Sequence, residues 1–253
     1  MKLSKKKVFA LALAVCLIAT VSMGTLAWFT DKDEVTNNFY VGDSGIGGGD
    51  DVFGVDVWEK VDTNRDGTME VIGKGDTTEN SAKFENILPG ETLVKEPYLT
   101  NTGVYSQFAR AIVTVSNATI LKDAMGADWD KANLFLTGTD AAKWTLDNII
   151  YTNDDKLVYI YYYNEVLLPD AQTAPIFTGV AIPGAMTVEQ AENLKNFDVH
   201  VLGEVIQSEH LADPDAPGTT ITGAKKAFTL YYDAQGTLAG VELTNIKATA
   251  KTI

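Results

Sequence analysis

The sequence predicts an all-β protein, a jelly-roll-like antiparallel β-sandwich with one or two short helices. Short runs of alternating apolar and polar residues recur along the chain. Turn signals separate these runs roughly every 8–12 residues, which is typical of sandwiches and jelly rolls. Few segments have the apolar spacing of a helix, and no internal repeat is evident.

Residues 1–27 have the architecture of a signal peptide. A lysine-rich start precedes an apolar run at 8–23, and small residues follow, so we expect cleavage after Ala27 and a mature chain that begins at Trp28. An uncleaved anchor that extends through Phe29 is the alternative. Cys16, the single cysteine, lies in the apolar run, so the mature chain is predicted to have no disulfide, thiol nucleophile or thiolate metal site.

The charge of the chain is strongly acidic. The whole sequence has a net charge of −14, and removing residues 1–27 removes four lysines and no acidic residue, which gives −18. Such a surface repels nucleic acid and anionic membranes, so neither is an expected partner. It favours counter-cations, which makes calcium the one cofactor worth testing.

The mature chain divides into an N-terminal segment with a glycine-rich linker, 28–50, and a sandwich domain, 51–253, of which 208–253 is an extension of unassigned role. The predicted strands are 52–62, its hairpin partner 68–73, two arms of 82–103 around a Pro89-Gly90 turn, 107–117, 156–168, 173–183, 197–207 and two within 227–253. Two short helices are candidates within 118–135. A capping-box pattern of Thr187 and Gln190 predicts another within 187–196.

The sharpest local motif is "DTNRDGTME" at 62–70, which begins like a calcium-binding loop. Oxygen-bearing residues alternate, and Gly67 permits the backbone to curl. The candidate ligands are Asp62, Asn64, Asp66, Thr68 and Glu70. The twelfth position is Gly73 instead of a bidentate glutamate, and the same residues favour a plain hairpin turn, which is the alternative.

Signals for an enzyme are weak, and no catalytic residue is predicted. His200 and His210 are the only histidines, and the H-E-x-x-H pattern of zinc proteases does not occur. The tyrosines and the tryptophans Trp58, Trp129 and Trp144 are expected in the core more often than on a carbohydrate-binding platform.

Four blocks in order resemble the TasA/camelysin family of secreted bacterial biofilm matrix proteins. They are "GTLAWFTDKDEVTNNFYVG", "FENILPGETLVKEPYLTNTGVYSQFARAIVTV", "YYYNEVLLPDAQTAPIFTGVAIP" and "NFDVHVLGEVIQ". The resemblance covers most of 18–207 and implies export from a Gram-positive cell, cleavage between Ala27 and Trp28 by the signal peptidase SipW, and a jelly-roll domain. It further implies head-to-tail assembly of the chain with itself into extracellular fibres, with an accessory matrix protein as a further partner.

An aromatic start beside a glycine-rich hinge suggests how such fibres form. We expect residues 28–41 to act as a donor strand that completes the sheet of a neighbouring subunit. The expected anchors are Trp28, Phe29, Val35, Phe39 and Val41. Two other functions remain open: a camelysin-like secreted metalloendopeptidase, for which no ligand set is recognised, and a calcium-dependent surface adhesion module.

Overall fold

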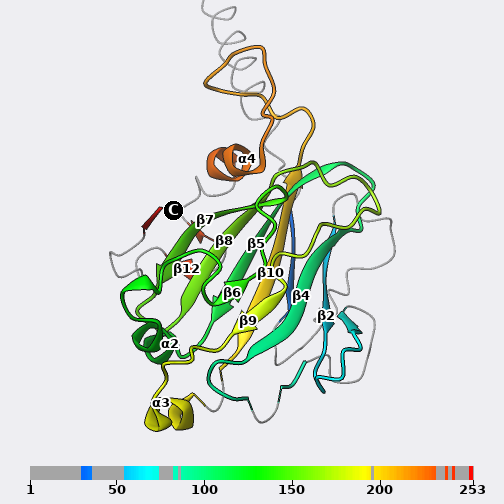
Figure 1. Ribbon diagram of the computed structural model, residues 1–253. Coiled ribbons are helices and arrows are strands. Elements are labelled where there is room, and N and C mark those ends of the chain that lie inside the picture. Colours follow the sequence, from blue (N-terminus) through cyan, green and yellow to red (C-terminus); the bar gives the residue numbers. More distant parts are fainter. Residues whose placement is uncertain are drawn as a thin grey trace, which may run out of the picture.

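The protein is an antiparallel β-sandwich, as the alternating pattern predicts (Figure 1). The structure, a computed structural model, describes residues 30–35, 54–73, 82–84, 87–194, 197–231, 237–238, 241–242 and 251–252. The predicted signal peptide, the glycine-rich linker and the predicted anchors Trp28, Phe29, Phe39 and Val41 lie outside the described residues.

Two sheets make the sandwich. The first runs in the spatial order β1 (Thr30–Val35), β10 (Val199–Gln207), β5 (Gln107–Val115), β8 (Leu157–Tyr163), β7 (Trp144–Tyr151) and β13 (Lys251–Thr252). The second runs in the order β3 (Glu70–Gly73), β2 (Val55–Val61), β4 (Thr92–Asn101), β9 (Gly179–Ala181) and β6 (Leu136–Thr137). A separate pair of two-residue strands, β11 (Thr237–Leu238) and β12 (Val241–Glu242), is antiparallel.

The helices are few and short. Of the two helices predicted within 118–135, only the first forms as an α-helix, and residues 129–134 are turns and bends. They are α2 (Ala118–Met125) with a 3-10 turn η1 (Gly126–Asp128), α3 (Val188–Asn193) and α4 (Ala224–Tyr231). The capping box predicted for α3 is present. The Thr187 N–H donates to Gln190 Oε1 at 2.8 Å, and the Gln190 N–H donates to Thr187 Oγ1 at 3.1 Å. Two orphan N–H groups at the start of the helix are thereby satisfied.

The main core fills the space between the sheets. On β5 its residues are small, and on the neighbouring β8 they are tyrosines, so Ala111 lies opposite Tyr161 and Val113 opposite Tyr159. Each large ring therefore has a small cross-strand neighbour on the same face, a pairing that lets the rings pack against the second sheet.

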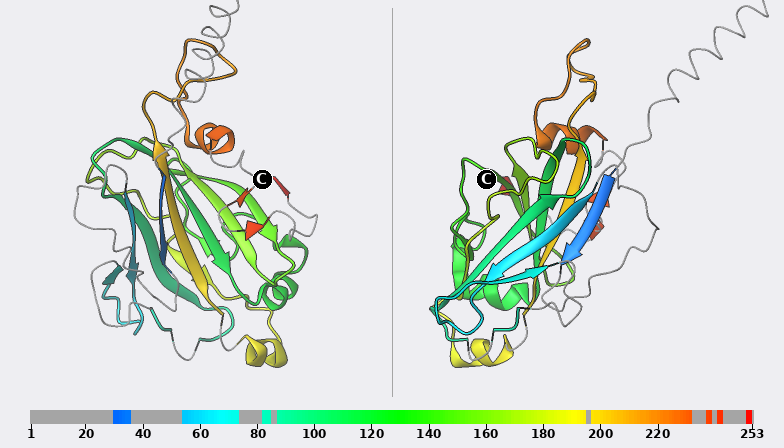
Figure 2. Two further views of the ribbon diagram at one scale, coloured as in Figure 1. Left: turned by 180° about the vertical axis from the view of Figure 1, so that it is seen from behind. Right: turned by 90° about the vertical axis from the view of Figure 1, so that its right-hand side faces the viewer.

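A second core lies on the outer face of the first sheet. The outward-facing residues of its central strands, such as Ile112 and Ile160, pack with Leu211, Ile221 and Phe228. Leu211, Ile221 and α4 thus pack on the sheet, with α4 lying across one end of it, while the loop between them projects beyond that end (Figures 1 and 2). This gives the first part of the extension a structural role. It also corrects the sequence prediction of a strand from 227 onward, because 224, 227 and 228 have helical spacing and are buried on one helix face.

Other strand predictions hold in part. The β2–β3 hairpin, β4, β5, β8 and β10 lie where they were predicted. The described residues of 82–88 form no strand, and most of 173–183 runs irregularly beside β4. In that segment only 179–181 pairs as β9, and Pro175 has no N–H to donate to a ladder.

Asn101, at the end of β4, joins the loops at one end of the sandwich. It is fully buried, and its amide nitrogen donates to the carbonyls of Tyr105 at 2.9 Å and Leu167 at 3.0 Å. Its Oδ1 accepts from the Gly103 N–H and from Gln107 Nε2, both at 2.8 Å. One side chain therefore fixes both the turn at 101–103 and the segment that follows β8.

Candidate functional site

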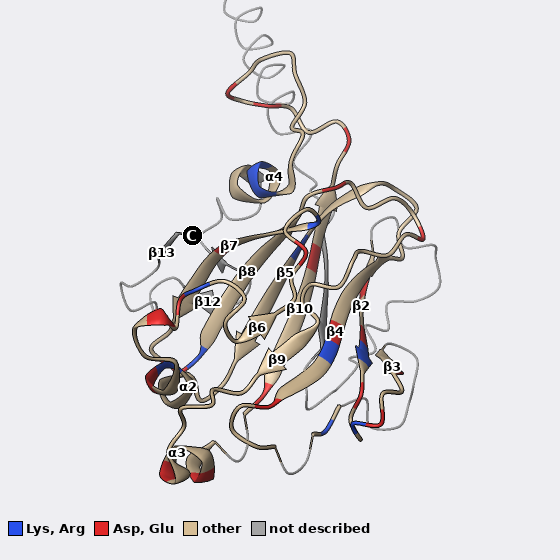
Figure 3. Ribbon diagram, in the orientation of Figure 1, with Lys and Arg blue, Asp and Glu red and all other residues tan. Residues whose placement is uncertain are grey.

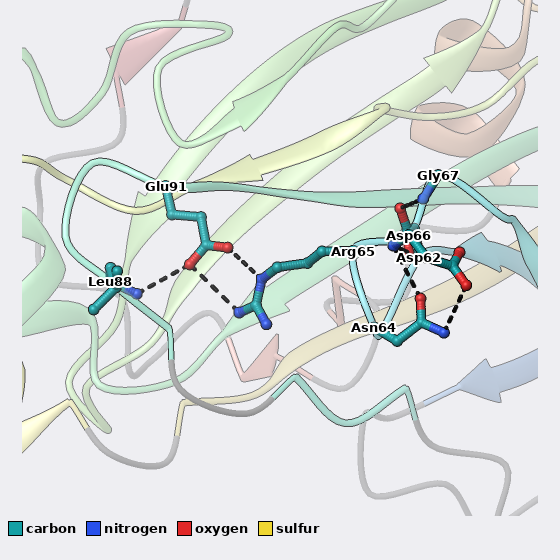
Figure 4. Close-up of polar contacts among 7 residues, drawn as sticks. All are labelled: Asp62, Asn64, Arg65, Asp66, Gly67, Leu88 and Glu91. Carbon is teal, nitrogen blue, oxygen red and sulfur yellow. Dashed lines mark hydrogen bonds and ion pairs between the residues drawn. The ribbon is translucent and has the colours of Figure 1, made fainter.

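The predicted calcium loop is the connection of the β2–β3 hairpin (Figure 4). Asp62 is nearly buried at the end of β2, and its two carboxylate oxygens accept from the backbone N–H groups of Asp66 at 3.1 Å and Gly67 at 2.9 Å. Gly67 has a φ of +83°, a left-handed conformation that glycine adopts at little cost. The loop therefore closes on the Asp62 carboxylate.

The other candidate ligands also bond within the loop. Asp66 accepts from the Thr68 N–H at 2.7 Å and from the Asn64 amide at 3.0 Å, and Glu70 accepts from the Thr63 hydroxyl at 3.2 Å. The Thr68 N–H is the main reason that the pKa of Asp66 lies below its ordinary value. Among the described residues, no group of three or more His, Cys, Asp or Glu side chains is arranged to hold a metal ion. Calcium binding at this loop stays a prediction.

An ion pair ties the same loop to the turn before β4. Arg65, with a φ of +60°, pairs with Glu91, which also accepts from the Leu88 N–H at 3.0 Å (Figure 4). The Leu88 N–H, and then Arg65, hold the pKa of Glu91 below its ordinary value. The loop is thus held from both sides by hydrogen bonds to ionised carboxylates, which are stronger than bonds between neutral groups.

The part of the expected donor segment that the structure describes, residues 30–35, is the edge strand of the first sheet. Its six residues, Thr30–Val35, pair with β10 in antiparallel register, from Thr30 opposite Ile206 to Val35 opposite Val201 (Figure 2). Val35 is the one predicted anchor among the described residues, and its register partner Val201 is completely buried in the main core. The strand pairs with β10 of its own chain.

Apart from Glu204, the buried side chains of β10 are apolar. Its inward-facing Val199, Val201 and Val205 belong to the main core, and Ile206 belongs to the outer one. Where Gly203 lies, a Cβ atom would come within 2.7 Å of Leu99 Cδ2, so the second sheet packs directly against the β10 backbone. Figure 3 shows single charged positions on several strands, and further charges on the connections and α3.

Two charged pairs buried in the strands were not predicted from the sequence. Arg110 on β5 and Glu204 on β10 are both 0% exposed, and Arg110 Nε lies 2.6 Å from Glu204 Oε2. The Arg110 guanidinium also lies 4.4 Å from the ring centroid of Phe228 on α4. This pair therefore sits on the outer face of the first sheet, between the edge strand and the covering helix.

The second pair, Glu59 on β2 and Lys95 on β4, lies inside the sandwich. Both side chains are buried and in ionic contact, and Glu59 Oε1 has no hydrogen-bond partner among the described residues. Burial lowers the pKa of Lys95 more than the neighbouring carboxylate raises it. The sequence could have indicated that Glu59 is buried, because it alternates with Val55 and Val57 on the inward side of its strand.

The aromatic residues serve mainly as core, as expected. Trp144 and the tyrosines of β8 are buried, and the Trp144 indole N–H donates to the Ala174 carbonyl at 2.9 Å. Trp129 is half-buried and packs edge-on against Tyr151, with their centroids 6.4 Å apart. His200 lies on β10, and His210 lies in the following connection with a φ of +61°.

Comparisons with protein-family models, curated proteins and solved structures found no match. Among the residues that the structure describes, no helix is both long and apolar enough to cross a membrane.

Proposed function

We propose that the protein is a secreted structural protein whose mature chains assemble into extracellular fibres by exchange of the N-terminal strand. The observation that carries the proposal is the pairing of Thr30–Val35 with the side of β10 that faces away from β5. An edge that accepts this strand from its own chain also accepts it from a neighbour, because the contacts are the same. Exchange of an identical element is a low-cost route to assembly, and head-to-tail contacts that do not close produce filaments.

The residues of β1 and β10 favour an edge strand, β1, that can leave β10 and be replaced. The sequence of β1 is TDKDEV, with four charged residues in six, whereas β10 is largely buried. Charges on an edge strand discourage further pairing. An occupied edge is therefore protected, and a vacated one exposes unpaired backbone groups above an apolar core, which favours capture of a second strand.

Features of the amino-acid sequence agree with this role. The four ordered blocks resemble the TasA/camelysin matrix proteins, and the aromatic pair Trp28 and Phe29 immediately precedes the pairing segment. The net charge and the expected signal peptide suit an extracellular protein. The same resemblance makes SipW and a matrix accessory protein candidate partners.

Disulfide trapping tests the proposal directly, because the mature chain has no cysteine of its own. Glu34 and Leu202 are opposite in the register. Opposed residues have Cα atoms about 4.5–5.5 Å apart, which a disulfide can span. We expect fibres of the mature Glu34→Cys/Leu202→Cys chain, when oxidised and dissolved in detergent, to give a ladder of covalent oligomers.

Three controls define the outcome. Each single-cysteine variant should give no ladder, and reduction should return the double variant to monomer. A chain that begins at Asn38 should form no filaments in electron micrographs. Fibres in which each chain is cross-linked only to itself would contradict strand exchange, and the lack of filaments from the chain that begins at Trp28 would contradict the proposed function as a whole.

A further inference from the structure

A row of alternating charge crosses the strand-accepting edge. In the β1–β10 ladder, position 32 is directly opposite Glu204, and in the β10–β5 ladder Glu204 is directly opposite Arg110. Directly opposed residues of antiparallel strands lie on the same face of a sheet. The sequence therefore places a lysine, a glutamate and an arginine in one line across three adjacent strands.

The carboxylate at the centre of this row, that of Glu204, is buried away from water. Glu204 and Arg110 are completely buried, 2.6 Å apart, and Phe228 covers the guanidinium from α4. A buried charge tolerates an opposite charge beside it and strongly disfavours a like charge. The residue that occupies the β1 position opposite Glu204 therefore bears on whether a strand fits this edge.

The sequence of β1 distinguishes the observed register from the neighbouring registers. Lys32 is the single basic residue of TDKDEV, and Asp31, Asp33 and Glu34 surround it. A slip of one residue in either direction would put an aspartate opposite Glu204, and a slip of two in one direction would put Glu34 there. Only the observed register places the basic residue of β1 at the position opposite Glu204.

We propose that Glu204 determines the register and the identity of the strand at the β10 edge, by requiring a basic residue, Lys32, directly opposite it. The strand that fits is a copy of this chain's own segment 30–35, or a segment with the same pattern of one cation flanked by anions. Where that strand comes from a neighbour, this inference rests on the proposed function. The register requirement itself applies equally to a strand of the same chain.

The test changes only the edge strand, because replacing Glu204 would leave Arg110 buried without its carboxylate and endanger folding. The variants are Lys32→Glu, the conservative Lys32→Arg, and Thr30→Glu as a matched control. The control introduces the same carboxylate two residues away, opposite Ile206. All are made in the mature chain that begins at Trp28.

The readout is hydrogen–deuterium exchange of the peptide that contains Val199–Gln207. An occupied edge protects the amides of β10 that point toward β1, and a released edge does not. We expect Lys32→Glu to exchange about tenfold or more faster in this peptide than the wild type, while Lys32→Arg and Thr30→Glu stay within about twofold of it. A near-UV circular dichroism spectrum like that of the wild type shows that each sandwich is folded.

Three results would overturn the inference: wild-type protection in Lys32→Glu, an equal loss in Thr30→Glu, or fibres of Lys32→Glu that form as readily as those of the wild type. Electron microscopy of the same samples separates this inference from the proposed function. If no chain forms fibres but only Lys32→Glu loses protection, the register requirement stands and fibre assembly fails. If Lys32→Glu forms fibres as readily as the wild type, the requirement fails and fibre assembly stands.

Discussion

Replacing Asn101 by alanine tests how far one buried amide holds the loop end of the sandwich together. The substitution removes two donated and two accepted hydrogen bonds, with lengths between 2.8 and 3.0 Å. The carbonyls of Tyr105 and Leu167 then lose a donor, and the Gly103 N–H loses its acceptor. Asn101 is 0% exposed, so water does not replace these partners without a local opening.

The expected cost follows from these four bonds. An intramolecular hydrogen bond has a net value of about 1 kcal/mol, and a buried group left unsatisfied costs about 1–3 kcal/mol. Because the bonds share one side chain, their costs do not add fully, and we expect a loss of about 3–5 kcal/mol in the free energy of unfolding. For a domain of this size, that corresponds to a fall in Tm of about 10 °C.

Urea denaturation followed by tryptophan fluorescence measures this loss. Asn164→Ala is the matched control, because Asn164 is exposed, so water can replace the bonds of its amide. That amide donates to the carbonyls of Ala141 and Ala142, both at 3.3 Å, and accepts from the Thr145 hydroxyl at 2.7 Å. The control should lose less than about 1 kcal/mol. If Asn101→Ala also lost less than about 1 kcal/mol, the loops would be held by their backbone ladders, and the reasoning from the amide would be wrong.

Three further predictions concern the charged groups. Lys95→Met should lower the free energy of unfolding, measured by urea denaturation, by about 3–5 kcal/mol, because Glu59 is left buried and unpaired. The double variant Glu59→Leu/Lys95→Met should be at least as stable as the wild type. Equal losses of stability in both variants would contradict this. If the carboxylate only caps the turn, Asp62→Ala should lower Tm relative to the wild type by the same amount in chelator and in millimolar calcium. A larger fall in Tm relative to the wild type in calcium would identify Asp62 as a calcium ligand. The pKa of Glu91 is lowered in the folded state, so its stabilisation is present above its ordinary value of 4.5 and is lost as the pH falls through the lowered pKa. Melting curves from pH 7 to pH 3 should therefore show a shallower acid dependence for Glu91→Gln, and identical slopes would refute the assignment.

The sequence predicts the fold class well because alternation survives wherever one face of a strand is buried. The alternation is lost, and the prediction fails, where the second face of a strand is also covered. In the tyrosine-rich strand β8 every residue from Leu157 to Tyr163 is buried, because residues of α4 and of the segment before it pack on its outer side. Strands buried on both faces are continuously apolar, and periodicity does not reveal what covers them.

Local irregularities hid other elements. Strand β7 was not predicted, and its register shifts between Leu146 and Asn148, which breaks the alternation of its side chains. Of the candidate site, the sequence located the hairpin loop at 62–70 and the edge segment. The Arg110–Glu204 pair depends on which strands become neighbours, and residues 94 positions apart carry no local signal of that contact.

The antiparallel ladder between β1 and β10 has a mechanical consequence. Its hydrogen bonds run perpendicular to the strands. In a fibre built by strand exchange, tension along the strand axis would load the pairs from Thr30 to Val35 together in shear, instead of opening them one after another. The tensile strength of such a fibre would then be that of one six-residue ladder, however stable the sandwich behind it.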